Sequence, residues 1–372
     1  MTSAADRRQA VRKSGLVWLG AAVVIVAVGR SSNLEILNVG ALTAIWALWS
    51  SSLNVVWGYG GDFSMAQIGL GAVGAYMEAV LVTHYGWPFW AALGGAVGAA
   101  VVVGFVIGVV AARLSGFYFS IMTLAFGLAL LALVPTLAIT GQSTGLPTNI
   151  APGTIRIGGL EWNLASRRGG YFLLCALVLV VVLFLVARLV KSPRGRAMVA
   201  VREDPVLATS VAIDVGRTRL VAFVLGAVIA GIAGVLYGGY LGFIFPSLFT
   251  FSAIITMIVQ VVLGGRGFLI GPLIGAAIYV VLTDWVRFGG QYSDGVFGLL
   301  LVVIILFAPK GLCGLGADAI DAFRRRREAG RAGTSLASGN QPGSGPTGTG
   351  PIAPASDDVG PHHSVVQTDG TR

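Results

Sequence analysis

The chain has 372 residues, of which 55% are hydrophobic and only 11% charged, and its mean hydropathy is +0.83. This composition excludes an ordinary soluble domain and predicts an all-α, polytopic integral membrane protein. The formal net charge of +9 does not indicate a nucleic-acid partner, because the basic residues flank apolar runs instead of forming one stripe. With two cysteines and three histidines, neither a zinc site nor a nucleophile with its base is expected, so we predict no metal, no cofactor and no catalytic residue.

Apolar runs long enough, or almost long enough, to cross a bilayer follow one another along the chain. We predict ten transmembrane helices from them, at 15–29, 34–57, 63–83, 88–112, 117–139, 171–190, 221–241, 248–263, 268–282 and 296–307. The first run follows four basic residues and lacks a convincing cleavage site. We therefore interpret it as an uncleaved span and not as a signal peptide.

The distribution of basic residues predicts the orientation. If the chain crosses ten times, 20 of its 25 Lys and Arg residues lie on one side, which is then the cytoplasmic side of the membrane. Both termini are cytoplasmic in this arrangement. The predicted parts are a cytoplasmic N-terminus (1–14), a transmembrane domain (15–310) with an extracytoplasmic loop (140–170) and a cytoplasmic loop (191–220), and a disordered tail (318–372). The outer loop carries short β-like pieces around 155–162.

The loop at 191–220 is basic and mostly polar, yet it contains a predicted short helix. Asp204 suits an N-cap, Pro205 the first helical position and Gly216 a helix end, so the pattern predicts a helix over 206–215. Apolar and small side chains share one arc of it, namely Leu207, Ala208, Val211, Ala212 and Val215. Such a face outside the membrane needs a partner. The alternative is a helix lying on the bilayer, with Arg194, Arg196 and Arg202 near lipid phosphates.

The 54 glycines are too many for turns alone, and most are spaced for close helix packing. Two stretches also echo each other: Gly60-Gly61 followed by Gly71-Ala72, and Gly264-Gly265 followed by Gly275-Ala276. Glycine-interrupted helices in corresponding halves indicate a translocation path, although four matching residues also arise by chance. The candidate path residues are Gly60, Gly61, Ser64, Gln67, Thr123, Gln260, Gly264 and Gly265.

Charged groups within the predicted spans are scarce. Glu78 is the only acid well inside one, towards its outer end. An ion-coupled carrier normally needs ionisable groups at mid-membrane, so this mechanism is disfavoured, whereas a passive channel stays open. No lysine stands in a GxxxxGK[ST] motif, so ATP-driven transport would require a separate ATPase polypeptide.

Five blocks occur in order along the chain: GDFSMAQIGLGAVGAY at 61–76, GFYFSIMTLAFG at 116–127, a long block over 192–237, VVLGGRGFLIGPLIGAA at 261–277 and LFAPKGL at 306–312. In these blocks the chain resembles the LivM-type permease subunits of branched-chain amino acid ABC importers. The resemblance implies an ABC-importer permease fold. It also implies that the chain translocates branched-chain or related small amino acids by alternating access, coupled to ATPases on other chains.

The resemblance further implies the partners. They are a second, LivH-like permease subunit, two ABC ATPase subunits and an extracytoplasmic substrate-binding protein, assembled in the lipid bilayer. The loop at 191–220 is similar to the coupling loop of such permeases, whose helix docks into a groove of the ATPase. The implied coupling residues are Arg194, Gly195, Arg196, Arg202, Glu203, Asp204, Leu207, Ala208, Val211, Ala212 and Gly216.

One outer segment departs from the family pattern. The family commonly has TGG, a small residue and then DGL or NGL, whereas this chain has TGQSTGL at 140–146. Gln142 replaces the second glycine and Thr144 the acidic or amide residue, and we add Gln142 to the candidate path. The departure leaves urea, amides or another small polar solute open as alternative cargo. A self-contained channel or ion-coupled carrier is the contrasting hypothesis.

Overall fold

The structure is a computed structural model that describes residues 33–148, 155–157, 160–162, 168–286 and 311–314. The predicted spans 15–29 and 296–307, the N-terminus and the tail lie outside these residues, so the count of ten helices is not confirmed. Within them, five helices are long and apolar enough to cross a membrane, and two further apolar helices are shorter. A polytopic α-helical membrane protein is confirmed at this level.

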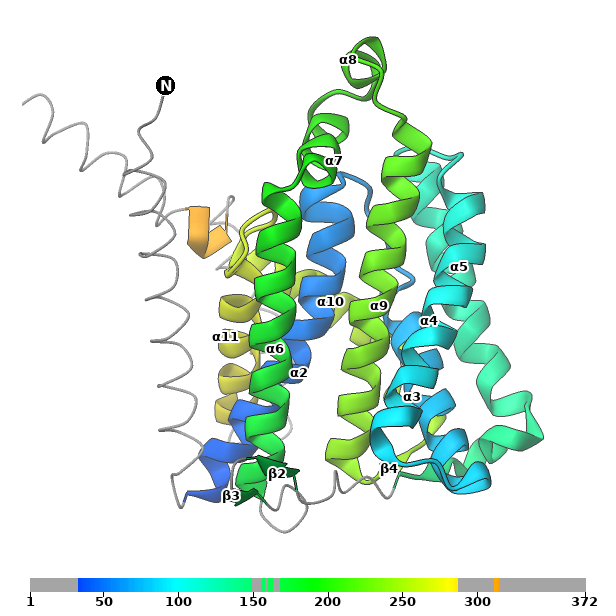
Figure 1. Ribbon diagram of the computed structural model, residues 1–372, viewed down its shortest axis with the longest axis vertical. Coiled ribbons are helices and arrows are strands. Elements are labelled where there is room, and N and C mark those ends of the chain that lie inside the picture. Colours follow the sequence, from blue (N-terminus) through cyan, green and yellow to red (C-terminus); the bar gives the residue numbers. More distant parts are fainter. Residues whose placement is uncertain (1–32, 149–154, 158–159, 163–167, 287–310, 315–372) are drawn as a thin grey trace, which may run out of the picture. The chain divides into compact units, whose positions relative to one another are not determined.

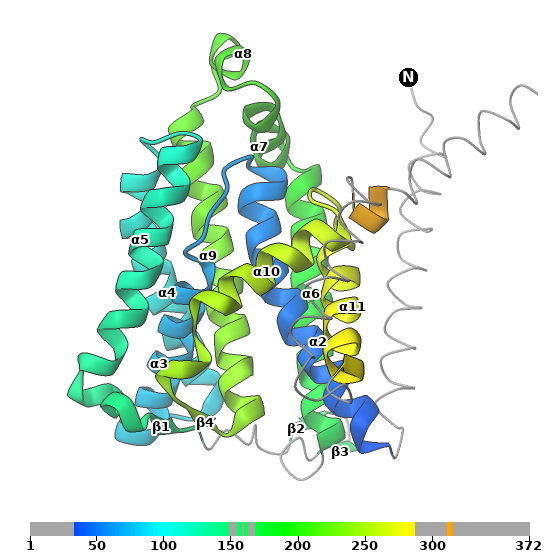
Figure 2. The ribbon, with the colours of Figure 1, turned by 180° about the vertical axis from the view of Figure 1, so that it is seen from behind.

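The described residues form a helical bundle (Figure 1). Its main helices are α2 (Leu34–Leu53), α3 (Gln67–Tyr85), α4 (Phe89–Ala111), α5 (Phe117–Leu133), α6 (Arg168–Lys191), α9 (Val215–Leu241), α10 (Phe251–Gly264) and α11 (Gly271–Val286). A π-helical turn, η1 (Asn54–Tyr59), continues α2. Two short helices, α7 (Pro193–Glu203) and α8 (Pro205–Ser210), protrude from one end of the bundle, at the top of Figure 1. Figure 2 shows α10 crossing the bundle obliquely.

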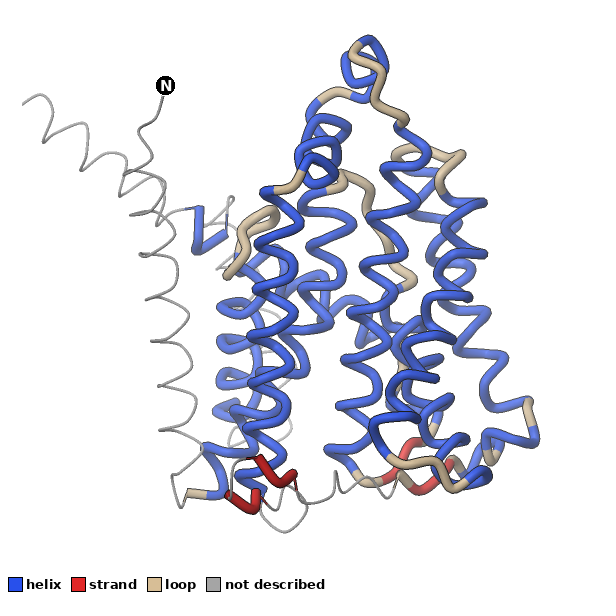
Figure 3. Tube along the Cα trace, viewed as in Figure 1, coloured by secondary structure: helices blue, strands red, loops and turns tan. Residues whose placement is uncertain are grey.

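Short strands lie at the end of the bundle opposite α8 (Figure 3). β1 (Leu146–Pro147) pairs antiparallel with β4 (Phe243–Ile244), and β2 (Ile155–Ile157) with β3 (Leu160–Trp162). The second pair confirms the β-like pieces predicted around 155–162. The remaining elements are the 3₁₀ turns η2 (Val134–Thr136), η3 (Ala138–Thr140), η4 (Gln142–Thr144) and η5 (Pro246–Leu248).

Most predicted spans in the described residues coincide with helices, with three differences. Residues 63–66 of the predicted span 63–83 are not helical, and α3 begins only at Gln67. The predicted span 117–139 ends at Leu133, where a proline at the start of η2 prevents further regular α-helical bonding. The helix predicted from 221 begins at Val215, because Asp214 accepts a hydrogen bond from the Arg217 amide and caps it.

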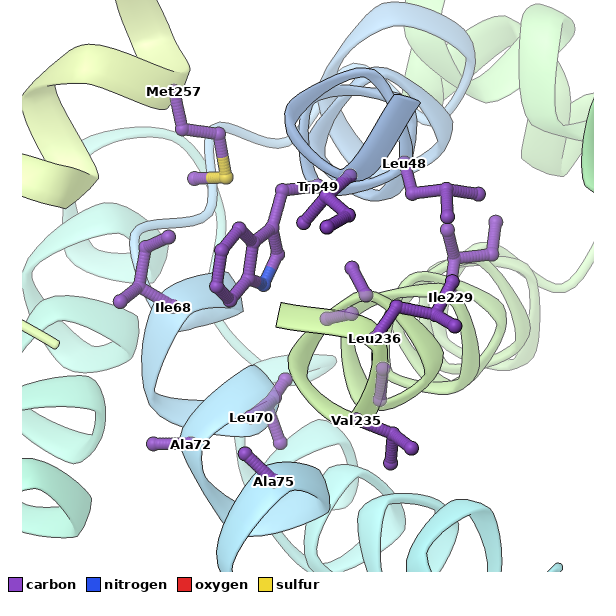
Figure 4. Close-up of a cluster of buried hydrophobic side chains, with 14 of the residues drawn as sticks. Leu48, Trp49, Ile68, Leu70, Ala72, Ala75, Ile229, Val235, Leu236 and Met257 are labelled. Atoms are coloured by element: carbon purple, nitrogen blue, oxygen red, sulfur yellow. The ribbon is translucent and has the colours of Figure 1, made fainter. Parts of the chain in front are cut away.

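The core is built around α9, which contacts α2, α3 and α4. Glycine allows α3 and α9 to cross closely: a Cβ at Gly234 would collide with the Gly71 carbonyl, and one at Gly74 would lie 2.7 Å from the Gly231 Cα. Figure 4 shows Trp49 of α2 beside this crossing, near Met257 of α10. The other side chains labelled there are Leu48, Ile68, Leu70, Ala72, Ala75, Ile229, Val235 and Leu236.

The helix crossing gives a first testable prediction. Gly234→Leu should lower the melting temperature and the yield of folded protein in detergent, because overpacking costs roughly 1–3 kcal/mol and here the obstacle is backbone. Gly94→Leu is the matched control, since nothing lies within 4 Å of a Cβ at this α4 position. Equal melting temperatures for the two variants would contradict the close crossing.

Candidate coupling and translocation site

The chain leaves helical geometry at both Gly-Gly pairs that the sequence singles out. After η1, Gly61 has φ +89°, and residues 61–66 run without helical bonding to α3. After α10, Gly265 has φ +101°, and α11 begins at Gly271. Both φ values lie where L-residues other than glycine are strained, so these positions suit helix breaks. We call 58–66 the first break and 264–271 the second break.

The two breaks lie side by side and Asn54 bridges them. Its Nδ2 donates to the Phe268 carbonyl at 3.0 Å, and the Gly267 amide donates to its Oδ1 at 2.8 Å. A Cβ at Gly58 would lie only 2.6 Å from the Gly267 nitrogen. Asn54 is 3% exposed, so its amide satisfies backbone groups of the second break inside the protein. No local sequence signal pairs Asn54 with residues 213 and 214 positions away.

Side chains from three other elements hold the first break. The Arg202 Nη1 donates to the Gly58 carbonyl at 2.6 Å, and the Met65 amide donates to the Thr123 Oγ1 at 3.2 Å. The Arg219 Nε lies 2.8 Å from the Asp62 Oδ2, in an ion pair whose side chains are only 11% and 8% exposed. Both arginines belong to the loop predicted at 191–220, at the end of α7 and in the first turns of α9.

The candidate polar path residues fall into two groups. Ser64, Gln67, Thr123 and Gln260 are all 0% exposed, inside the bundle. Gln260 accepts a 2.5 Å hydrogen bond from Ser50 of α2, and Ser64 lies within 3.5 Å of the Gln67 Nε2. Within the described residues, the Gln67 Oε1 and the Gln260 Nε2 have no hydrogen-bond partner.

Gln142 is not brought together with these residues. It lies in η4, with φ +52° and an exposed side chain, at the strand-bearing end of the bundle. Short strands and 3₁₀ turns lie at this end, where the Thr148 Oγ1 donates to the Gly238 carbonyl at 2.9 Å. The sequence could group Gln142 with the others only by motif, since its distance from them depends on the tertiary fold.

The helix predicted over 206–215 is correct at its start and wrong at its end. The amides of Val206 and Leu207 donate to the Asp204 Oδ1 at 2.8 and 3.0 Å, which confirms the N-cap. However, α8 ends at Ser210: the Ile213 amide donates to the Ala208 carbonyl and the Ala212 amide to the Thr209 carbonyl, with Ala212 at φ +60°. This is a Schellman closure with alanine at the usual glycine position. Gly216 is therefore the second residue of α9, not a helix end.

The predicted apolar arc of this helix is also divided. Leu207 and Val211 are 65% and 68% exposed, and Val206 is 76% exposed. Ala208, in contrast, is 3% exposed, because it faces the rest of the loop. The available apolar surface, which we call the α8 patch, therefore consists of Val206, Leu207 and Val211.

The preceding helix, α7, was not predicted separately from the sequence. The Ser192 Oγ accepts from the Gly195 amide at 3.2 Å and caps it, while Met198 and Val201 are buried against the bundle. Gly195 is required because a Cβ there would collide with the Leu189 carbonyl. The candidate coupling residues Arg194, Arg196 and Glu203 are exposed on α7, and Ala212 is exposed after α8.

Two acids are buried among the described residues. Asp62 is paired with Arg219, whereas Glu78 is 0% exposed and neither of its carboxyl oxygens has a hydrogen-bond partner among the described residues. No group of three or more His, Cys, Asp or Glu that could hold a metal occurs in this part of the chain. Contacts from the protruding loop instead reach the first break, through Arg202 on Gly58 and Arg219 on Asp62.

Comparison with known proteins shows the family to which the chain belongs. The family model described as "Branched-chain amino acid transport system / permease component" matches residues 35–307. The chain belongs to this permease family. It is therefore a transport permease subunit and not itself an enzyme.

Individual relatives support the assignment. The high-affinity branched-chain amino acid transport system permease protein LivM of Escherichia coli K12 is 33% identical over 296 residues, covering 74% of this chain and 69% of the relative. LivM of Salmonella typhimurium is 32% identical over 323 residues, covering 81% and 75%. LivH of Salmonella typhimurium is 35% identical over 125 residues, covering 33% and 40%. No solved structure matches the chain.

The buried ion pair of this permease gives a second prediction. Asp62→Asn should lower the free energy of unfolding in detergent by roughly 3–5 kcal/mol, because it leaves the Arg219 guanidinium buried without its counter-charge. Arg217→Gln is the control: its ion pair with Asp214 is 87% and 56% exposed, so its loss should change stability by about 1 kcal/mol or less. If Asp62→Asn is as stable as this control, the pair does not fix the first break.

Proposed function

We propose that this permease is the membrane-spanning subunit of an ATP-driven importer for branched-chain or related small amino acids. The family match and the names of the relatives support the cargo class. Its partners would be a second, LivH-like permease, two ATPases and an extracytoplasmic binding protein. The loop at 191–220 and both termini would face the cytoplasm of a bacterial plasma membrane, with 140–170 outside.

The α8 patch is the observation that carries this proposal. Val206, Leu207 and Val211 expose apolar surface on a capped turn of helix beyond the ends of the long helices. Figure 2 shows α7 between α8 and the bundle, so α8 projects beyond the ends of the long helices. A groove in a protein partner is the environment that suits it better.

The same loop supplies a route for movement. It is continuous with α6 at Lys191 and with α9 at Val215, so a displacement of α8 pulls on two helices together. ATP-driven closure of the ATPases would tilt these helices about the glycine crossing of α3 and α9 and so alternate access. The buried Gln67 and Gln260 lie on helices that meet the two breaks and are suited to line the path.

Docking of an ATPase is tested at the α8 patch. Leu207→Asp or Val211→Asp should leave the permease inserted and paired with its sister subunit but abolish ATPase co-purification, because a groove desolvates the new charge. Thr209→Asp adds the same charge to an exposed position elsewhere on α8 and should have little effect. Retained ATPase binding in the patch variants, with loss in Arg194→Gln or Arg196→Gln that depends on anionic lipid, would favour the bilayer alternative.

The cargo is tested by uptake into vesicles that hold the reconstituted importer with its binding protein. Labelled leucine should accumulate only with ATP, and isoleucine and valine should compete whereas urea and short amides should not. Competition by urea or amides alone would identify the alternative cargo. Uptake by this chain without ATPases would instead support a channel or an ion-coupled carrier.

A further inference from the structure

The C-terminal end of α7 meets both helix breaks through one side chain. Arg202 stands in the last turn of α7, next to Val201, which is 2% exposed and anchors the helix. A Cβ at Gly61 in the first break would lie 2.9 Å from the Arg202 Cα and Cγ. A Cβ at Gly267 in the second break would lie 3.0 Å from the Arg202 Nη1. Two of the glycines that make the breaks thus also make room for this arginine.

Arg202 donates a hydrogen bond to a backbone carbonyl that has lost its helical donor at the first break. Gly58 lies in the last turn of η1, and the chain stops being helical after Gly61, so the usual amide donors to this turn are missing. The Arg202 Nη1 donates to the Gly58 carbonyl at 2.6 Å instead. Its Nε and Nη2 face the Glu203 carboxylate, which orients the guanidinium, and this hydrogen bond lowers the pKa of Glu203.

The two arginine contacts of the first break differ in how easily they separate. Arg202 is 34% exposed and binds a neutral carbonyl, so breaking that bond leaves no unpaired buried charge. Arg219 is 11% exposed, is paired with the carboxylate of Asp62, and also donates to the Leu114 carbonyl at 3.0 Å. Separating Arg219 from Asp62 would leave two buried charges, which is far more costly than leaving one neutral carbonyl without its donor.

We propose that Arg202 is the positioning residue that transmits movement of the 191–220 loop to the two helix breaks. It acts as a latch that releases and re-forms its hydrogen bond to the Gly58 carbonyl, while Arg219 and Asp62 act as a fixed pivot. This inference rests on the proposed function, because the force on the loop comes from the ATPases. It assigns Arg202 an intramolecular role, in contrast to the patch residues that bind the ATPase. Coupling then depends on α7 as well as on α8.

The test uses Arg202→Gln in the assembled importer in vesicles. ATPase co-purification and basal hydrolysis should stay at wild-type levels, whereas the stimulation of hydrolysis by substrate-loaded binding protein and the ATP-driven uptake should each fall by roughly tenfold, a common size for coupling between sites. Arg202→Lys should recover part of both, since an ammonium can donate to the same carbonyl. Arg217→Gln, which removes an exposed arginine from the same loop, is the matched control and should couple normally.

Wild-type stimulation and uptake in Arg202→Gln would overturn the proposal, and so would loss of ATPase binding in that variant, which would make Arg202 a docking residue. If Arg202→Gln does not assemble, Arg202→Lys decides: reduced stimulation at wild-type melting temperature supports the latch, and wild-type stimulation refutes it. Failure of the proposed function would be recognised separately, because the unmodified chain would then bind no ATPase and show no ATP-driven uptake.

Discussion

A backbone group released from a helix within a membrane domain must find a partner inside the protein, because no water is available there to replace the lost hydrogen bond. This constraint governs the two breaks. Asn54 satisfies the second break at Gly267 and Phe268, while Arg202 and Thr123 satisfy the first at Gly58 and Met65. The breaks are consequently not flexible joints. They are held by side chains from distant parts of the chain, and whatever moves those side chains moves the breaks.

The loop between α6 and α9 carries the α8 patch and also contacts the first break. Its α7 end carries Arg202 and its α9 end carries Arg219, so the two ends of one loop hold Gly58 and Asp62, four residues apart. The chemistry of the two contacts is unequal, since one is a part-buried bond to a neutral carbonyl and the other a buried ion pair. In the proposed mechanism, this unequal pair of attachments converts displacement of the loop into rotation of the segment between them.

Local patterns in the sequence predicted the features that depend on local physics. Apolar runs gave the spanning helices, Asp204 gave the cap of α8, and the Gly-Gly pairs marked both breaks. The non-helical course of 63–66 was missed because Phe63, Met65 and Ala66 continue the apolar run of α3. The end of α8 was missed because Ala212 takes a left-handed conformation that sequence patterns assign to glycine. The pairing of Asp62 with Arg219 and the burial of Ala208 arise only when distant segments pack together.

The central claim is that the loop at 191–220 moves the first break when ATP binds. Hydrogen–deuterium exchange of the assembled importer, compared without nucleotide and with a non-hydrolysable ATP analogue, tests it most directly. The account predicts that nucleotide changes the exchange of the amides of 58–66, whereas exchange in α4, around Gly94, stays the same. Protection of α8 by the ATPase with unchanged exchange across 58–66 in both states would contradict it.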